Sequence, residues 1–314
     1  MLSSSVTRSG PSSLTLGTRG SALARWQTDW VAARLREAWP GLECVSQLFT
    51  TAGDRIIDKP LTEFGGKGVF TEELESALRA GEIDLAVHSL KDLPIEDSPG
   101  LTLGAICARA DARDVLIARD RWTLATLPNG ARVGTCSLRR TAQLLAARPD
   151  LKPHPVRGNV DTRIRKAMQG DYDAIVLAAA GVLRLGLDHY ISDYLPLEVM
   201  LPAPGQAALA VQCRADDART RELLQPLDDA PTRAAVTAER AFLQALGGGC
   251  SAPVAAYARA EDSRFKIQIS MTGSIASVDG RRVIRVFGEG SDSVALGQTL
   301  AQQGLAQGAQ ELLI

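Results

Sequence analysis

The sequence predicts an α/β protein with parallel-rich sheets, followed by a small α+β region at its C-terminal end. Short apolar runs such as Leu85-Ala-Val87 alternate with stretches of helical length from Leu14 to about residue 212. This alternation is typical of βαβ units and parallel sheets. After residues 228–231 one helix is followed by several strand-like segments, which is the pattern of a separate α+β domain.

Length, charge and cysteine content restrict the class of protein. The 314 residues suffice for two or three domains, and the net charge of −1 disfavours a nucleic-acid or membrane partner. Five scattered cysteines without a C-x-x-C pair disfavour a disulfide framework and a metal site, and favour a reducing compartment. No apolar run reaches transmembrane length. We therefore expect a cytoplasmic protein that holds no metal.

The first α/β unit begins at Leu14, after a serine-rich stretch (1–13) that we expect to be a disordered tail. Its helices are expected to begin at Ser21 and Thr71, which can cap them, and the second ends at Gly81. Its expected strands are Leu14–Thr18, Glu43–Phe49 and the run from Leu85 to Val87. The long connection Thr50–Gly68 is typical of a lid or binding loop, although a disordered segment has the same signature.

The stretch 84–94 is the one around which the rest is organised. Its buried strand ends in His88-Ser89, and Lys91 and Asp92 follow, held by the stiff Pro94. Ligands of open α/β sheets bind outside the carboxyl ends of the strands. We therefore expect Lys91 and Asp92 at the mouth of a cleft.

Further strands lead into a second α/β unit, and the chain then returns through a turn at Pro202–Gln206. Its helices are expected at Ser137–Arg148 and Asp161–Gln169. The expected strands are Leu101–Arg109, Asp114–Arg119, Arg132–Thr135, His154–Arg157, Tyr172–Ala180 and, after the turn, Ala207–Gln212.

The C-terminal region is expected to contain a helix from about residue 231 to Leu246, which Gly247-Gly-Gly249 ends. A hairpin with Asp279-Gly280 at its turn follows. A final helix carries Leu300, Leu305, Leu312 and Leu313.

Arginines follow the ends of several expected strands. Arg139 and Arg140 begin a helix, where free N–H groups and the helix dipole also favour an anion. On their own these two arginines fit a solvated helix face equally well. Arg19, Arg157, Arg163 and Arg184 occupy related positions and favour a cleft for a polyanion. Phosphates and carboxylates both fit, but the chain lacks the glycine motifs of nucleotide sites.

Cys250 lies between Gly247-Gly-Gly249 and Ser251-Ala-Pro253, a flexible flank that favours an accessible thiol able to form a covalent bond. The three histidines (His88, His154, His189) are distant in the sequence, so a Cys-His hydrolase has little support.

Taken together, these segments resemble the porphobilinogen deaminase family, also called hydroxymethylbilane synthases, over nearly the whole chain from Leu14. The motifs that carry the resemblance occur in the family's order and approximate spacing: Thr18–Ala24, Gly65–Phe70, His88–Pro94, Ser137–Arg140, Val156–Asn159, Ala178–Leu187, Pro202–Gln206 and Gly247–Pro253. Cys136 occupies a position where the family is expected to have serine, and residues 1–13 lie outside the match.

The resemblance implies a specific transferase. A dipyrromethane cofactor would be tethered through a thioether to Cys250, and four porphobilinogen molecules would be deaminated and joined onto it head to tail. Water would then release hydroxymethylbilane for tetrapyrrole biosynthesis. Each ring bears an acetate and a propionate, so the growing oligopyrrole is a polyanion, the ligand that the arginines favour.

The resemblance also implies roles for individual residues. Asp92 would be the catalytic carboxylate, Lys67 would lie in a mobile loop, and Phe70 would stack on a pyrrole. The residues implied to bind substrate or cofactor are Arg19, Ser21, Lys91, Thr135, Ser137, Arg139, Arg140, Arg157, Asn159, Arg163, Arg184 and Gln206.

The family's fold implies two lobes like those of periplasmic binding proteins and a third domain that carries the cofactor. The expected domains are 14–110 with 203–225, then 111–202, and finally 230–314, in a protein expected to be a monomer. The alternative is a two-lobed anion-binding module without catalysis, which gives Asp92 and Cys250 no task. A nucleic-acid binder is weaker still, because aromatic residues make up only 4% of the chain.

Overall fold

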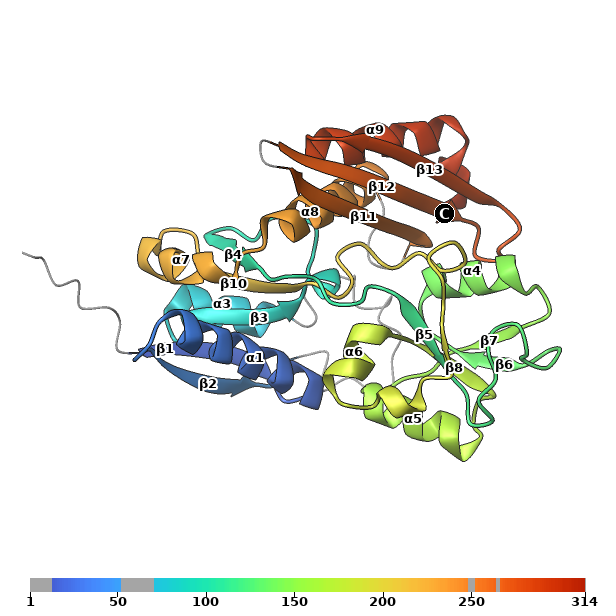
Figure 1. The fold of residues 1–314 in the computed structure, drawn as a ribbon, viewed down its shortest axis with the longest axis horizontal. Helices are drawn as coiled ribbons and strands as arrows, with labels where there is room; N and C mark the ends of the chain where they lie inside the picture. The colour runs from blue at the N-terminus through green and yellow to red at the C-terminus, as the bar shows by residue number, and fades with distance from the viewer. Residues whose placement is uncertain (1–12, 52–70, 248–251, 264–265, 314) are drawn as a thin grey trace, which may run out of the picture.

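The computed structural model describes residues 13–51, 71–247, 252–263 and 266–313. Three sheets lie in separate regions of the molecule; in Figure 1 the first is mainly blue to cyan with β10 in yellow-orange, the second is mainly green, and the third is orange to red. Two are parallel-rich with helices packed on them, and the third is antiparallel. The prediction of two α/β lobes with an added α+β domain is therefore confirmed.

The first sheet has the strand order β2-β1-β3-β10-β4. Its central strand β3 (Leu85–Ser89) is parallel to β1 (Ser13–Arg19) and antiparallel to β10 (Leu209–Arg214). Leu85 and Val87 pack toward α1, whereas Ala86 packs toward α3, as the alternation of side chains along a strand requires. The other elements of this lobe are β2 (Glu43–Phe49), β4 (Leu101–Ile106), α1 (Ala22–Ala38), α3 (Glu72–Ala80), α7 (Ala218–Leu224), η2 (Leu90–Asp92) and η4 (Gln225–Leu227).

The second sheet has the order β7-β6-β8-β5-β9, and β6 is parallel to both of its neighbours. The chain enters this lobe between β4 and β5 and leaves it between β9 and β10, so two segments connect the lobes. Its elements are β5 (Asp114–Ile117), β6 (Arg132–Gly134), β7 (Lys152–His154), β8 (Ala174–Ala178), β9 (Asp193–Tyr194), α4 (Leu138–Ala147), α5 (Val160–Gln169), α6 (Ala179–Arg184) and η3 (Asp188–Tyr190).

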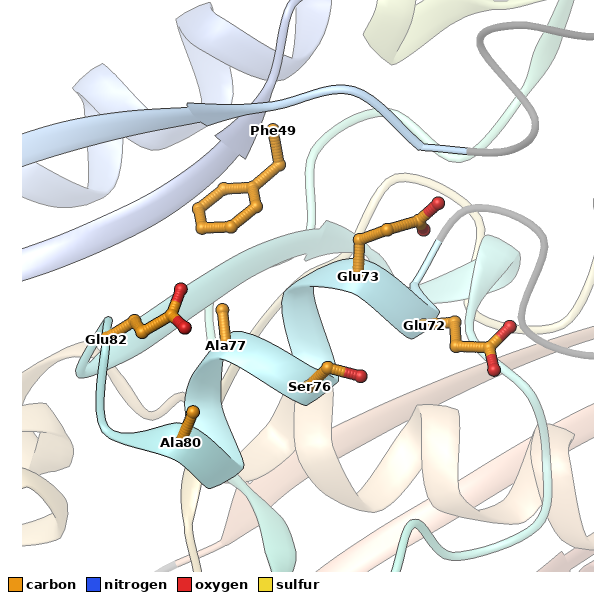
Figure 2. A pocket seen from close by; sticks show the side chains of 7 residues that line it. All are labelled: Phe49, Glu72, Glu73, Ser76, Ala77, Ala80 and Glu82. Carbon is orange, nitrogen blue, oxygen red and sulfur yellow. The ribbon is translucent and has the colours of Figure 1, made fainter.

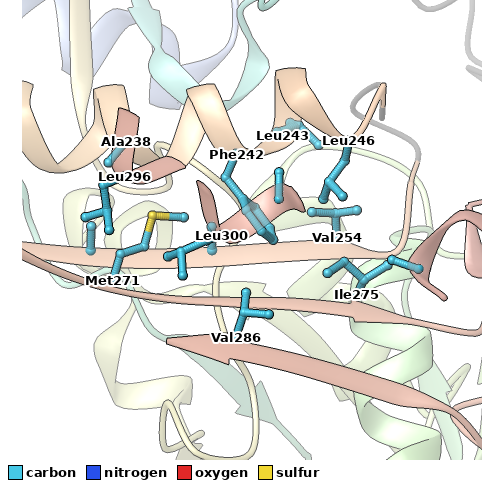
Figure 3. Close-up of a cluster of buried hydrophobic side chains, with 14 of the residues drawn as sticks. Ala238, Phe242, Leu243, Leu246, Val254, Met271, Ile275, Val286, Leu296 and Leu300 are labelled. Atoms are coloured by element: carbon cyan, nitrogen blue, oxygen red, sulfur yellow. The ribbon is translucent and has the colours of Figure 1, made fainter. Parts of the chain in front are cut away.

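The third domain packs two helices on one face of an antiparallel sheet. Phe242 is fully buried between α8 and the sheet, among Met271, Ile275 and Leu300 (Figure 3). Gly273 makes room for the ring, because a Cβ at this position would lie 2.5 Å from its Cζ atom. The elements are α8 (Ala230–Ala245), β11 (Val254–Ser263), β12 (Lys266–Ala276), β13 (Val283–Gly290), α9 (Ser293–Ala306) and η5 (Ala309–Leu312).

Most expected boundaries agree with the structure to within a few residues, and three expectations are wrong. The strand expected at His154–Arg157 ends at His154, because Pro155 has no N–H to continue the ladder. The apolar run Tyr172–Ala180 changes from strand to helix at Ala179, a distinction that an apolar run cannot make. The last helix ends at Ala306, and Leu312 lies beyond the left-handed Gly308.

The capping expectations have mixed outcomes. Ser21 accepts a hydrogen bond from the Ala24 N–H at 3.2 Å, and Gly81 has the left-handed conformation. Thr71 precedes α3 as expected, but its side chain makes no capping bond. The hairpin turn at Gly280 is confirmed. Within the described ranges, every helix is too short or too polar to span a lipid bilayer.

Candidate active site

The centre of the site is a buried carboxylate, Asp114, at the start of β5. Its Oδ2 lies 2.8 Å from Nη1 of Arg139, and its Oδ1 lies 2.7 Å from Nη2 of Arg140. Burial alone would raise the pKa of Asp114, but the charges of the two arginines outweigh burial and hold that pKa well below its ordinary value. Asp114 is therefore ionised, and the three side chains together carry one net positive charge.

Both arginines are buried, so the alternative of a solvated helix face is wrong. Arg139 also donates to the Leu201 carbonyl at 2.5 Å, and Arg140 donates to the Val176 carbonyl at 3.1 Å. Nε of Arg140 is a buried donor without an acceptor among the described residues. Within the described part of the chain, one hydrogen-bond donor of Arg140 is thus unused.

A lysine from the first lobe joins this cluster. Lys91 donates from Nζ to Oε1 of Gln206 at 3.3 Å, and Gln206 donates from Nε2 to Oδ1 of Asp114 at 2.9 Å. Burial lowers the pKa of Lys91 to about 8; the positive charges of Arg139 and Arg140 act in the same direction. The site is therefore built from both lobes and from the segment that connects them.

Asp92 lies beside Lys91 and lines a cavity of about 90 Å³ together with Arg19, Ser21 and His88. These residues come from the carboxyl ends of β1 and β3 and from the start of α1. The expected position of Asp92 outside the end of β3 is confirmed.

The arginine Arg163 extends the cluster on the second lobe. Its Nε donates to the Gly158 carbonyl at 2.7 Å. Burial lowers the pKa of Arg163, the charge of Arg140 adds to this effect, and the negative charge of Asp92 opposes it. The charges of Asp92 in the first lobe and Arg163 in the second thus act on one another. Arg157 is half-buried before α5, and Asn159 is exposed at its N-cap.

Thr135 and Ser137 form the turn that begins α4. The Oγ1 of Thr135 accepts a hydrogen bond from the Ser137 N–H at 3.1 Å, and the Ser137 hydroxyl caps the helix by accepting from the Arg140 N–H at 3.4 Å. Cys136 between them is exposed, and its Sγ donates to the Val156 carbonyl at 3.2 Å. These contacts fix the start of the helix that carries Arg139 and Arg140.

Arg184 connects the two lobes. Its Nη2 donates to the Ala207 carbonyl at 2.8 Å, and its guanidinium carbon lies 5.7 Å from the centre of a Trp26 ring. Burial lowers the pKa of Arg184 to about 10. Three further expected site residues, Lys67, Phe70 and Cys250, lie outside the described residues.

A second cavity, of about 440 Å³, lies between Phe49 and α3 (Figure 2). Its carboxylates, Glu72, Glu73 and Glu82, would repel an acidic ligand. This cavity therefore does not fit the polyanion that the arginine cluster favours.

Two family models cover most of the chain. Residues 14–222 match the model described as "Porphobilinogen deaminase, dipyromethane cofactor binding domain", and residues 233–306 match "Porphobilinogen deaminase, C-terminal domain". The chain belongs to the porphobilinogen deaminase family. The resemblance found in the sequence is therefore confirmed.

Curated relatives agree over nearly the full length. A porphobilinogen deaminase of Brevibacillus brevis is 49% identical over 95% of this chain and 96% of its own. One of Roseiflexus castenholzii is 51% identical over 96% of this chain and 98% of its own. Among solved structures, the periplasmic VFT2 domain of BvgS from Bordetella pertussis is 16% identical, with a TM-score of 0.42, over 68% of this chain and 86% of that one. A similarity that weak carries no argument about function.

Proposed function

We propose that this member of the family is a transferase that joins four porphobilinogen molecules head to tail, releases ammonia and yields hydroxymethylbilane. The observation that carries the proposal is that Asp92 lines a cavity with Arg19 and adjoins Lys91, which joins the buried arginine cluster of the second lobe through Gln206. A substrate with two carboxylates per ring needs several cations, and a reaction that builds positive charge on a pyrrole needs a carboxylate.

The cluster around Asp114 suits the dipyrromethane cofactor. Buried guanidinium groups match carboxylate oxygens, and the Nε donor of Arg140, which has no acceptor among the described residues, supports a carboxylate ligand there. We propose that Arg139, Arg140 and Arg163 hold cofactor carboxylates and that Cys250 forms the thioether. When bound, the cofactor supplies the pyrrole carbon to which substrate is joined.

Asp92 has the chemical role in this proposal. Its exposed carboxylate can balance positive charge on the substrate pyrrole as ammonia leaves, and can accept a proton at its oxygen atoms. Lys91, next to it in the chain, and Arg19, which lines the same cavity, would bind substrate carboxylates. The anion-binding module without catalysis is not favoured, because its two lobes leave unexplained the third domain that the second family model matches.

Intact mass and activity together test the proposal. The purified protein should exceed its sequence mass by two porphobilinogen units less two ammonia, and should form hydroxymethylbilane. Cys250→Ser should lack both the extra mass and the activity, because serine is a poor nucleophile at neutral pH. Asp92→Asn should keep the extra mass but turn over roughly a hundredfold to a thousandfold more slowly. Full activity at unmodified mass would reject the proposal.

We further propose a monomer in a reducing compartment such as the cytoplasm. The four described cysteines are all unpaired, which supports the second part. Light scattering on the purified protein tests the first part, and a mass near 33.4 kDa is expected.

A further inference from the structure

We propose that Asp114 and Gln206 are positioning residues, which orient Lys91, Arg139 and Arg140 as one unit toward the carboxylates of the growing chain. This inference rests on the proposed function for its ligand. Its geometry stands independently, because every contact it uses is within the described residues.

Asp114 has no role of its own toward a ligand, because it is fully buried and carries the same charge as the substrate. Each of its oxygens is instead paired with a different arginine. The two guanidinium groups would repel one another without it. A carboxylate between them therefore orients Arg140 through a hydrogen bond and holds Arg139 close through its charge.

Gln206 links Asp114 to Lys91 of the first lobe through hydrogen bonds. It is fully buried, and its amide nitrogen donates to the Ala112 carbonyl at 2.8 Å as well as to Asp114. These two donor bonds fix which end of the amide is oxygen, and that oxygen accepts from Lys91. The amide therefore sets the position of the Lys91 ammonium group relative to the two arginines.

The backbone of Gln206 is itself held by the third domain. Arg109 donates from Nε to the Gln206 carbonyl at 2.8 Å, and its guanidinium pairs with the buried Glu239 of α8. The positioning residues thus lie where all three domains meet. A displaced third domain would disturb the same cations that we propose to bind the chain growing from it.

The first test compares Asp114→Asn with a matched control, Asp84→Asn. Asp84 likewise pairs with an arginine, the half-buried Arg214, at 3.1 Å. However, Asp84 precedes β3, at the end of the strand away from the site. We expect kcat/KM to fall at least tenfold in Asp114→Asn and to stay within about twofold of wild type in Asp84→Asn. Equal losses in both variants would overturn the proposal.

A second readout needs no substrate. Acetic anhydride labels only the neutral amine, so the labelling rate of Lys91 against pH, followed by peptide mass spectrometry, reports its pKa. The charged groups that act on Lys91 are Asp92, Asp114, Arg139 and Arg140. Removing the charge of Asp114 should lower the labelling midpoint of Lys91, and Gln206→Glu should raise it, each by about half a pH unit or more.

A double variant tests whether the charge itself matters. Asp114→Asn with Gln206→Glu moves the carboxylate across a 2.9 Å hydrogen bond, so the double variant should regain part of the activity that Asp114→Asn loses.

Should Asp114→Asn fail to fold, Gln206→Leu tests the link to Lys91 alone and should also shift the labelling midpoint of Lys91. A Lys91 midpoint unchanged in every variant would sink the proposal. Shifted midpoints in a wild-type protein without synthase activity would reject the function and leave the positioning role standing.

Discussion

His88 shows how the environment of one side chain sets its charge. It is 7% exposed, and its Nε2 has no hydrogen-bond partner among the described residues. Burial lowers its pKa to about 4; the charge of Glu75 opposes this shift, and the charge of Arg19 adds to it. The imidazole beside the active-site cavity is therefore neutral at physiological pH.

This buried neutral histidine predicts an acid-sensitive fold. The unfolded chain binds a proton at His88 near pH 6.5, but the folded chain does so only near pH 4. Between these values the unfolded state holds more protons, so stability falls as the pH is lowered, by up to about 3 kcal/mol. Urea denaturation at several pH values should show a weaker dependence in His88→Gln. Exposed His189→Gln is the control, and a slope in His88→Gln equal to that of the wild type would contradict the prediction.

For individual residues, the sequence reveals the charged side chains that follow the ends of strands, but not the side chains that they pair with in space. Lys91, Asp92 and Arg19 are found because ligands bind at the carboxyl ends of strands. Asp114 is missed, since it lies 25 residues before Arg139 and its only signal is a charged residue opening the apolar run Val115–Ile117. Pairing through space between a strand and a later helix leaves no local pattern.

At the scale of elements, hydrophobic periodicity predicts most helices and strands, and the failures have local causes. The change from β8 to α6 occurs within a run of alanines, where the same residues suit a buried strand or a buried helix. The two-residue strand β9 is too short to produce a pattern, although it completes the second sheet.

The hairpin between β12 and β13 touches the helix that carries the arginines. Gly280 has φ +71°, and a Cβ there would lie 2.5 Å from the Ala146 nitrogen and 2.6 Å from the Ala142 oxygen of α4. The third domain thus packs directly against the helix that carries Arg139 and Arg140.

Gly280→Ala should therefore destabilise the protein more than its backbone conformation alone requires. Gly186 provides the control, because it has φ +68° and nothing within 4 Å of an added Cβ. Gly186→Ala should cost about 1 kcal/mol, the ordinary penalty of the left-handed region. The clash with α4 should cost Gly280→Ala about 1–3 kcal/mol more in urea denaturation. Equal losses of unfolding free energy in the two variants would show that the hairpin can move away from α4 without cost.

At the scale of the molecule, the order of the domains follows from the sequence, but their junction does not. The change of pattern after residue 228 reveals the third domain. The expected boundaries 14–110 with 203–225, 111–202 and 230–314 stay a proposal, supported by the membership of the three sheets. Several contacts that hold the domains together join residues nearly a hundred or more positions apart, such as Arg109 with Gln206 and with Glu239.

Glu239 holds that junction together. It is fully buried in α8 and accepts from the Gly205 N–H at 2.7 Å, from the Ala258 N–H at 2.8 Å and from both terminal nitrogens of Arg109. One carboxylate thus ties the helix of the third domain to its own sheet and to both segments that connect the lobes.

Glu239→Gln tests this arrangement, because the amide keeps the size but leaves the mostly buried Arg109 without its counter-charge. Removing one partner of a buried ion pair typically costs about 3–5 kcal/mol, so urea denaturation should show a loss of that order. Adding Arg109→Met removes the uncompensated charge, so the double variant should be more stable than the sum of the two single losses predicts. The double variant should remain less stable than the wild type, since Arg109 also donates a hydrogen bond to the Gln206 carbonyl. Strictly additive losses would mean that the two side chains stabilise the junction independently.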